Sequence, residues 1–313
     1  MDVHTIDCHY ADLPKVAAAY LLVDGDEAAF VETCTSRSLP HLLGALADAG
    51  LTREQVRYVV ITHIHLDHAG GAGALMAACP NATLLAHPKA APHAVDPSRI
   101  VAGATTVYGD QRFAELYGEV TPIAAPRVRA LEDEAEVPFG RGVLRFLHTR
   151  GHANHHFVVV APNADAVFTG DAFGIQYPRL QSHGVFAFPS TSPTDFDAAA
   201  AHEAVDRIVG TGMGRAFPTH FGEQRELDAI AAQLHSLLDE HSAILEEADA
   251  ADLQGPALDS FCQERVAAVF RDHVEHAGLT GHPGTALLEL DIDLNAQGIS
   301  FALAKRRYKR QRA

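Results

Sequence analysis

The chain has 313 residues, of which 47% are hydrophobic and 20% charged, a composition typical of a folded globular protein with a sizeable core. Lys and Arg total 24 against 40 Asp and Glu, which gives a formal net charge of -16. This acidic balance argues against a broad nucleic-acid-binding face, because such a face requires clustered positive charge, and no nucleic-acid partner is expected.

The four cysteines are scattered and include no C-x-x-C pair, so neither a disulfide framework nor a thiolate zinc site is expected. The first residues lack the pattern of a signal peptide, and no apolar run approaches the length that crosses a membrane. We therefore expect a cytoplasmic protein without a membrane partner. Six of the 24 basic residues fall in residues 305–313, a run typical of a solvated, frayed terminus.

The first part of the chain alternates predicted strands with predicted helices. The turn Asp24-Gly25-Asp26 between two apolar runs predicts a hairpin, and leucines at helical spacing predict a helix that ends at Gly50. In chain order, we expect strands at residues 17–23 and 28–31, a helix at 38–49, a strand at 58–61, a helix at 72–79 and a strand at 83–86.

Four potential metal ligands follow the strand at residues 58–61. His63 and His65 alternate, so in an extended segment they point the same way. Asp67 and His68 come at the turn and can face a neighbouring point from the other side, just before a glycine-rich helix entry. Such a segment can supply ligands to two adjacent metal ions, two from each pair, because metal sites are recognised by clusters of these side chains.

Residues 88–126 change this pattern, with prolines at 88, 92 and 97 that interrupt it and a predicted helix at 111–117. The insertion is placed where a lid over a site could lie, and a surface excursion is the alternative. After it the chain is strand-rich from residue 128 to residue 169. Because strands and helices alternate in both halves, the sequence predicts two layers packed sheet to sheet with helices outside.

Helices dominate the last part of the chain. They are predicted at residues 194–209, 223–249, 256–276 and 285–294, with a last core strand at 215–219. We therefore expect a metal-binding core at residues 1–222, with the insertion around 88–126, and a helical appendage at residues 223–313 that docks on the core and ends in the basic tail.

Three later segments each place one potential ligand at the end of a predicted strand. They are Gly151-His152, Gly170-Asp171 and Thr219-His220. Each is weak alone, because a single strand-end His or Asp is more often a capping or core residue. Together with the first cluster, they favour one metal centre.

The series H-x-H-x-D-H, then G-H, G-D and H, resembles the motifs of the metallo-β-lactamase-fold superfamily over roughly residues 15–222. The resemblance implies an α+β fold, a four-layer αββα sandwich, here with the C-terminal helical appendage in a glyoxalase-II-like layout. It also implies two divalent metal ions. Their ligands would be His63, His65 and His152 for one ion, Asp67, His68 and His220 for the second, and Asp171 as a bridge between both.

The donor types agree with this resemblance. Imidazole and carboxylate without thiolate suit zinc, which we expect, with iron or manganese as alternatives. Two cations about 3.5–4 Å apart can share a hydroxide, since each lowers the pKa of bound water. We expect this hydroxide to attack an ester-type bond (thioester, lactone or related) of a small-molecule substrate. Asp67 would orient the nucleophile and pass a proton to the leaving group. A homodimer is compatible with the sequence.

Two positions depart from the family pattern. Glu32-Thr33-Cys34 replaces the usual Asp-x-Gly beneath the site, which leaves the support of the ligand loop open. Lactone-cleaving relatives carry a tyrosine three residues beyond the bridging Asp, where this chain has Gly174. Tyr177 is a second candidate catalytic residue, as a donor that polarises the carbonyl, or else a packing residue. The alternative functions are a phosphodiesterase, a di-iron redox or oxygen-binding protein, and a non-catalytic protein that keeps the metal centre.

Overall fold

The computed structural model describes residues 1–191 and 193–312, and the chain divides into two compact units. Unit 1 and unit 2 each combine segments that are distant in the sequence. Unit 1 consists of Met1–His148, His155–Gly170 and Thr211–Arg225, and unit 2 consists of Thr149–Asn154, Asp171–Gly210 and Glu226–Ala313. The sequence-based division at residue 222 stays a prediction.

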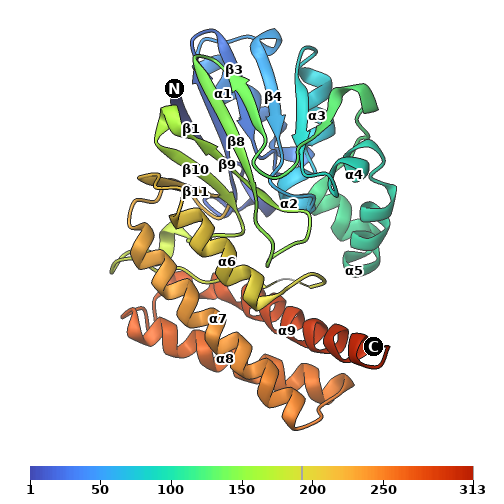
Figure 1. Cartoon of the computed structure of the whole chain (residues 1–313), viewed down its shortest axis with the longest axis vertical. Helices are drawn as coiled ribbons and strands as arrows, with labels where there is room; N and C mark the ends of the chain where they lie inside the picture. Colours follow the sequence, from blue (N-terminus) through green and yellow to red (C-terminus); the bar gives the residue numbers. More distant parts are fainter. Residues whose placement is uncertain (192, 313) are drawn as a thin grey trace. The chain divides into compact units, whose positions relative to one another are not determined.

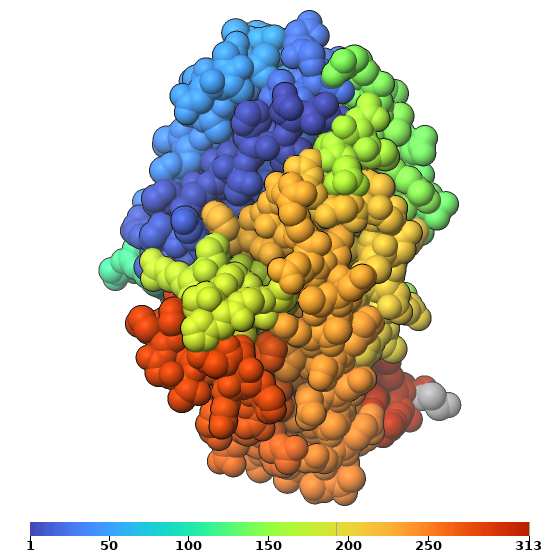
Figure 2. All heavy atoms as spheres, turned by 90° about the vertical axis from the view of Figure 1, so that its left-hand side faces the viewer, coloured from blue at the N-terminus to red at the C-terminus, as the bar shows by residue number. Residues whose placement is uncertain are grey.

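Unit 1 contains a first sheet whose order follows the sequence. Its strands are β1 (Asp2–Asp7), β2 (Ala18–Asp24), β3 (Glu27–Val31), β4 (Val56–Val60), β5 (Thr83–Ala86) and β6 (Val128–Ala130). The first three strands pair antiparallel and the others parallel. The edge strand β1, visible in dark blue in Figure 2, is mostly exposed. The predicted hairpin of β2 and β3 is confirmed.

A second sheet in unit 1 has the order β11-β10-β9-β8-β7. Its strands are β7 (Glu136–Phe139), β8 (Gly142–His148), β9 (Phe157–Ala161), β10 (Ala166–Gly170) and β11 (Arg215–Pro218). The two sheets share an apolar core, in which the Tyr20 ring of β2 lies 5.3 Å from the rings of Phe168 and Phe217. The predicted sheet-to-sheet packing is therefore confirmed, and Figure 1 shows it.

Helices cover the other face of the first sheet. They are α1 (Leu39–Asp48), α3 (Ala72–Ala78) and α4 (Ala91–Val95), with the one-turn helix α2 (Leu66–Ala69) before α3 and α5 (Ser98–Tyr117) after α4. Buried leucines of α1 and α3 join one core with β3 and β4, as their helical spacing predicts. Both α4 and α5 belong to the predicted insertion, and Phe113, Leu116 and Tyr117 of α5 pack in a small cluster with Leu66.

Unit 2 is built mainly from α6 (Ala198–Val209), α7 (Leu227–Ala250), α8 (Gly255–His276) and α9 (Leu288–Arg310). The last helix is much longer than predicted, because it takes in most of the basic run. Arg306, Arg307 and Arg310 contact the Asp249 carboxylate at 2.6, 2.8 and 2.7 Å. The expectation of a frayed tail was therefore wrong for the described part of the run, and Ala313 lies outside the described residues.

None of the helices within residues 1–191 and 193–312 combines the length and the apolar character needed to span a membrane. The same residues contain the two sheets and the long C-terminal helices that the sequence predicts, so the α+β class is confirmed.

Candidate metal centre

The ligand loop of unit 1 changes from extended to helical conformation over a few residues. The chain leaves β4, passes His63, and enters α2 directly after His65, which is extended with φ -63° and ψ 147°. His63 Nε2 lies 2.9 Å from His65 Nδ1. Asp67 and His68 lie inside α2. This change in backbone separates the two pairs, as the sequence pattern predicts.

His220, which follows β11, meets the second pair. The Asp67 Oδ2 atom lies 3.6 Å from His68 Nε2 and 3.5 Å from His220 Nε2. Donor atoms of these three residues lie within 4.8 Å of one another, and so do those of Glu32, His63 and His68. Unit 1 therefore brings together imidazole and carboxylate donors that could hold metal ions, without a thiolate among them, and this donor set fits the metals expected from the sequence.

Each of these imidazoles has an outer partner for its other ring nitrogen. His220 Nδ1 lies 2.7 Å from the Val16 carbonyl oxygen, and His68 Nδ1 lies 3.4 Å from Glu32 Oε1. His63 Nδ1 lies 3.1 Å from the Thr62 hydroxyl. A proton held on Nδ1 by an outer acceptor leaves the Nε2 lone pair as the metal-binding atom, and such partners also fix the ring orientation.

Glu32 is a buried residue beside the candidate ligands, and the sequence left its role open. It follows β3 with a positive φ of 69°, its amide donates to the Val60 carbonyl at 2.8 Å, and its side chain is only 1% exposed. Its Oε1 atom accepts hydrogen bonds from the hydroxyls of Thr62 and Thr219, at 3.3 Å for Thr219, in addition to the contact with His68. One buried carboxylate thus contacts all three segments that carry the candidate ligands of unit 1.

Gly71 lets the ligand loop pack closely against the chain that follows β3. A Cβ atom at this position would lie 2.6 Å from the carbonyl oxygens of both Thr33 and Thr35. Gly71→Ala is therefore expected to destabilise the protein by about 1–3 kcal/mol, because rigid backbone must move. Urea unfolding measures the change. The matched control is Gly44→Ala in α1, where a Cβ meets nothing within 4 Å. This control should be neutral or stabilising, and equal stabilities of both variants would contradict the argument.

Two further side chains of unit 1 lie in the electrostatic field of Asp67, namely Tyr10, which precedes β2, and Tyr117 of α5 in the insertion. The Tyr10 and Tyr117 hydroxyls lie 3.4 Å apart. Burial, and after it the negative charge of Asp67, raises the pKa of both phenols well above the usual value. Both therefore stay protonated donors at neutral pH. Sequence reasoning missed them because nothing local marks a tyrosine that is distant from the ligand loop along the chain.

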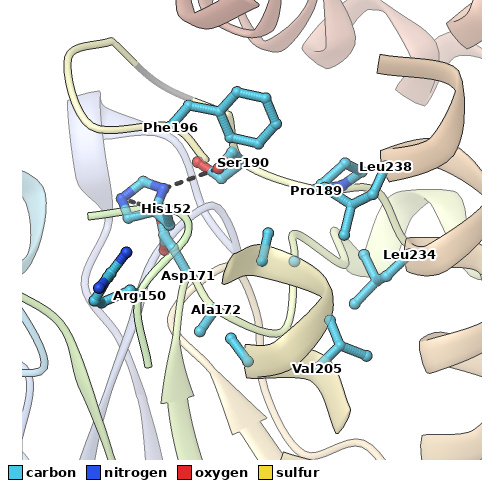
Figure 3. A pocket seen from close by; sticks show the side chains of 13 residues that line it. Arg150, His152, Asp171, Ala172, Pro189, Ser190, Phe196, Val205, Leu234 and Leu238 are labelled. Atoms are coloured by element: carbon cyan, nitrogen blue, oxygen red, sulfur yellow. Dashed lines mark hydrogen bonds and ion pairs between the residues drawn. The ribbon is translucent and has the colours of Figure 1, made fainter. Parts of the chain in front are cut away.

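Unit 2 contains the other two predicted ligands. His152 lies four residues after β8, and Asp171 directly follows β10. The His152 Nδ1 atom lies 2.9 Å from the Ser190 carbonyl oxygen, and its Nε2 atom lies 3.5 Å from Asp171 Oδ2 (Figure 3). The outer carbonyl thus turns Nε2 towards the carboxylate, in the same arrangement as in unit 1.

A pocket in unit 2 opens beside these two side chains. Its free volume is about 20 Å³, which is room for about one water molecule. Figure 3 shows His152 and Asp171 on one side and Val205, Leu234 and Leu238 on the other. The wall formed by α6 and α7 is apolar, and Arg150 lies at the opposite edge. The pocket therefore combines a polar end with an apolar wall, in a space of about the size of a water molecule.

Gly174, which lines this pocket, has a positive φ of 72°. A Cβ atom there would lie 2.5 Å from a methyl group of Leu234 and 2.6 Å from the Phe188 carbonyl oxygen. The backbone therefore leaves no room for a tyrosine at this position. Tyr177 is buried, does not line the pocket, and its hydroxyl lies 3.4 Å from Asp291 Oδ1. These contacts favour a packing role, and its action on a substrate stays a prediction.

Comparison with known proteins agrees with this architecture. The family model described as the metallo-beta-lactamase superfamily matches residues 13–220. The chain belongs to this superfamily. A curated relative from Sulfurisphaera tokodaii, the metallo-beta-lactamase fold-containing protein ST1585, is 25% identical over 194 residues, which cover 61% of this chain and 67% of the relative. The predicted family is therefore confirmed.

Solved structures show the same fold. The crystal structure of ST1585 from Sulfolobus tokodaii superimposes with a TM-score of 0.64 at 20% identity, covering 95% of this chain and 97% of that one. The metallo-beta-lactamase family protein TTHA1429 from Thermus thermophilus also has a TM-score of 0.64, at 19% identity, covering 97% and 93%. A flavo di-iron protein from Thermotoga maritima has a TM-score of 0.51 at 12% identity, covering 72% and 53%. These likenesses confirm the predicted αββα sandwich with C-terminal helices.

Proposed function

We propose that the protein is a binuclear metal-dependent hydrolase that acts on an ester-type bond of a small molecule. The observation that carries this proposal is that the side chains of Asp67, His68 and His220 converge. The outer ring nitrogen of His68 contacts Glu32, and that of His220 contacts the Val16 carbonyl. The order of the family motifs supports adding the remaining donors to the same centre. The full proposed ligand set is His63, His65, Asp67, His68, His152, Asp171 and His220, with Asp171 as the bridge.

Two divalent ions, zinc first and iron or manganese as alternatives, would supply a water that is acidic enough to ionise near neutral pH. The protein contributes the positioning and a proton carrier. Asp67 suits the second task, because its side chain is 27% exposed whereas those of His68 and His220 are 0% and 7% exposed. A carboxylate reachable from solvent can hold the nucleophile in place and then pass its proton to the leaving group.

The apolar side chains beside His152 and Asp171 support a substrate with a small apolar portion. They form a wall of aliphatic side chains from α6 and α7. A short hydrocarbon group next to a thioester or lactone carbonyl suits such a wall better than a phosphodiester, which keeps a charge near the scissile bond. The net charge of -16 also disfavours a polyanionic substrate.

The proposal is tested by metal counting and a substrate screen. Purified protein is expected to bind two divalent ions per chain at this centre and to hydrolyse members of a thioester and lactone panel. His220→Ala should lose one of these ions together with the activity, whereas His276→Ala, at an exposed position of α8, should keep both. Turnover of phosphodiesters without ester turnover would contradict the proposal. So would iron content with oxygen consumption and no hydrolysis.

A further inference from the structure

A second group of metal-type side chains lies on the surface of unit 2, apart from the proposed ligands. The helices α6 and α7, which pack side by side (Figure 1), each carry a histidine followed four residues later by an aspartate. The pairs are His202 and Asp206 on α6, and His235 and Asp239 on α7. Residues four apart share one helix face, so each helix presents one imidazole and one carboxylate to the other.

Each histidine contacts the aspartate of the other helix. His202 Nε2 lies 3.3 Å from Asp239 Oδ1, and His235 Nε2 lies 3.1 Å from Asp206 Oδ1. The two imidazole rings lie edge to edge and nearly in one plane, with their centroids 4.9 Å apart and their planes 7° apart. Each carboxylate thus belongs to the opposite helix from the histidine that it contacts.

This arrangement favours the same tautomer in both rings. The Asp206 carboxylate accepts a hydrogen bond, so Nε2 of His235 carries a hydrogen, and the Asp239 carboxylate beside Nε2 of His202 favours a hydrogen there too. In a neutral imidazole the lone pair is then on Nδ1. The two Nδ1 atoms face each other at 2.6 Å. Two nitrogen lone pairs at this distance repel each other unless a cation lies between them, which is either a proton or a metal ion.

We infer that His202 and His235 form a site for a divalent transition metal, with zinc as the reference ion. Histidines whose outer nitrogen donates to a carboxylate are the usual form of zinc-ligating histidine, because the carboxylate raises ligand basicity. Zinc–nitrogen bonds of about 2.0–2.1 Å require the two Nδ1 atoms to separate to roughly 3.3 Å. Side chains that are 27% and 31% exposed can make this small movement, and water can fill the remaining coordination positions.

Occupation of this site would join the two helices that form the apolar wall of the pocket. Each of the four residues is the sequence neighbour of a residue that lines it. The neighbours are Ala201 before His202, Val205 before Asp206, Leu234 before His235, and Leu238 before Asp239. A metal ion on the outer surface of α6 and α7 would therefore restrain the helix turns whose inner side chains line the pocket. This inference does not depend on the proposed hydrolase activity.

The test is a zinc titration of metal-stripped protein by calorimetry, comparing wild type with His202→Gln and His235→Gln. Wild type is expected to bind one zinc ion more than either variant. Asp206→Asn combined with Asp239→Asn should keep the site but weaken it about 10- to 100-fold. His276→Gln, on the exposed surface of α8, is the matched control and should bind as wild type.

Copper EPR gives a second readout, in which wild type should show a copper species with two nitrogen ligands in addition to the copper of the proposed centre, and the histidine variants should lack that additional species. Equal zinc stoichiometry in wild type and both variants would overturn the inference and leave a proton as the only cation between the rings. Circular dichroism of the variants checks that the helices are intact, and the zinc count of the proposed centre should not change in any of them.

Discussion

Replacing Glu32 with leucine is expected to lower the metal affinity of the centre about 10- to 100-fold and to destabilise the fold by about 3 kcal/mol. The reason is that one buried carboxylate oxygen accepts from Thr62, His68 and Thr219. Leucine fills a similar volume but accepts nothing, so these donors would lose their common acceptor in a place that water does not reach. Isothermal titration with zinc measures the affinity, and urea unfolding of metal-free protein measures the stability.

The Glu32→Gln variant separates charge from hydrogen bonding. Its amide oxygen can still accept from the two threonine hydroxyls, so most of the stability should return while the negative charge beside His68 is lost. Metal affinity in this variant should therefore lie between that of wild type and that of the leucine variant. If both variants bound zinc as tightly as wild type, Glu32 would have no role in orienting the ligand segments.

The ligand motifs could be read from the sequence because each is local. Strand periodicity places His63 and His220 directly after apolar runs, and the structure has β4 and β11 there. The bounds of helices could also be predicted to within a few residues where the spacing of leucines is regular, as in α1 and α7. Such patterns indicate which face of a single helix or strand is buried, and this can be predicted from the spacing of apolar residues alone.

The remaining features depend on contacts between distant segments. The strand β1 was missed because an exposed edge strand shows little apolar alternation, and Asp2, His4 and Thr5 are all exposed. The length of α9 was missed because its last turns are stabilised by Asp249 of α7, and the guanidinium of Arg307, followed by that of Arg310, lowers the pKa of this carboxyl to about 2. The sequence alone does not show that Asp249 of α7 contacts the basic residues of α9, because this contact depends on how the two helices pack.

His241→Leu is expected to remove a pH dependence of the stability of unit 2. His241 lies fully buried in α7, and neither ring nitrogen has a hydrogen-bond partner among the described residues. Burial lowers the pKa of its imidazole from the ordinary value of 6.5 to about 4. Between pH 6.5 and pH 4 the unfolded chain binds a proton at this histidine and the folded chain does not. The contribution of neutral His241 to the free energy of unfolding is therefore complete above pH 6.5 and is lost as the pH falls towards 4. The full loss is about 3 kcal/mol.

Urea unfolding of wild type and His241→Leu at pH 7 and pH 5 measures this contribution, because protonation of all other groups cancels in the difference between the two proteins. The leucine variant should gain about 2 kcal/mol relative to wild type when the pH is lowered from 7 to 5. It should also be at least as stable as wild type at pH 7, since an apolar side chain replaces a buried polar one without hydrogen bonds. His4→Leu, at an exposed position of β1, should follow the wild-type pH dependence. Parallel pH profiles of wild type and His241→Leu would mean that the buried imidazole is protonated as readily as in the unfolded chain.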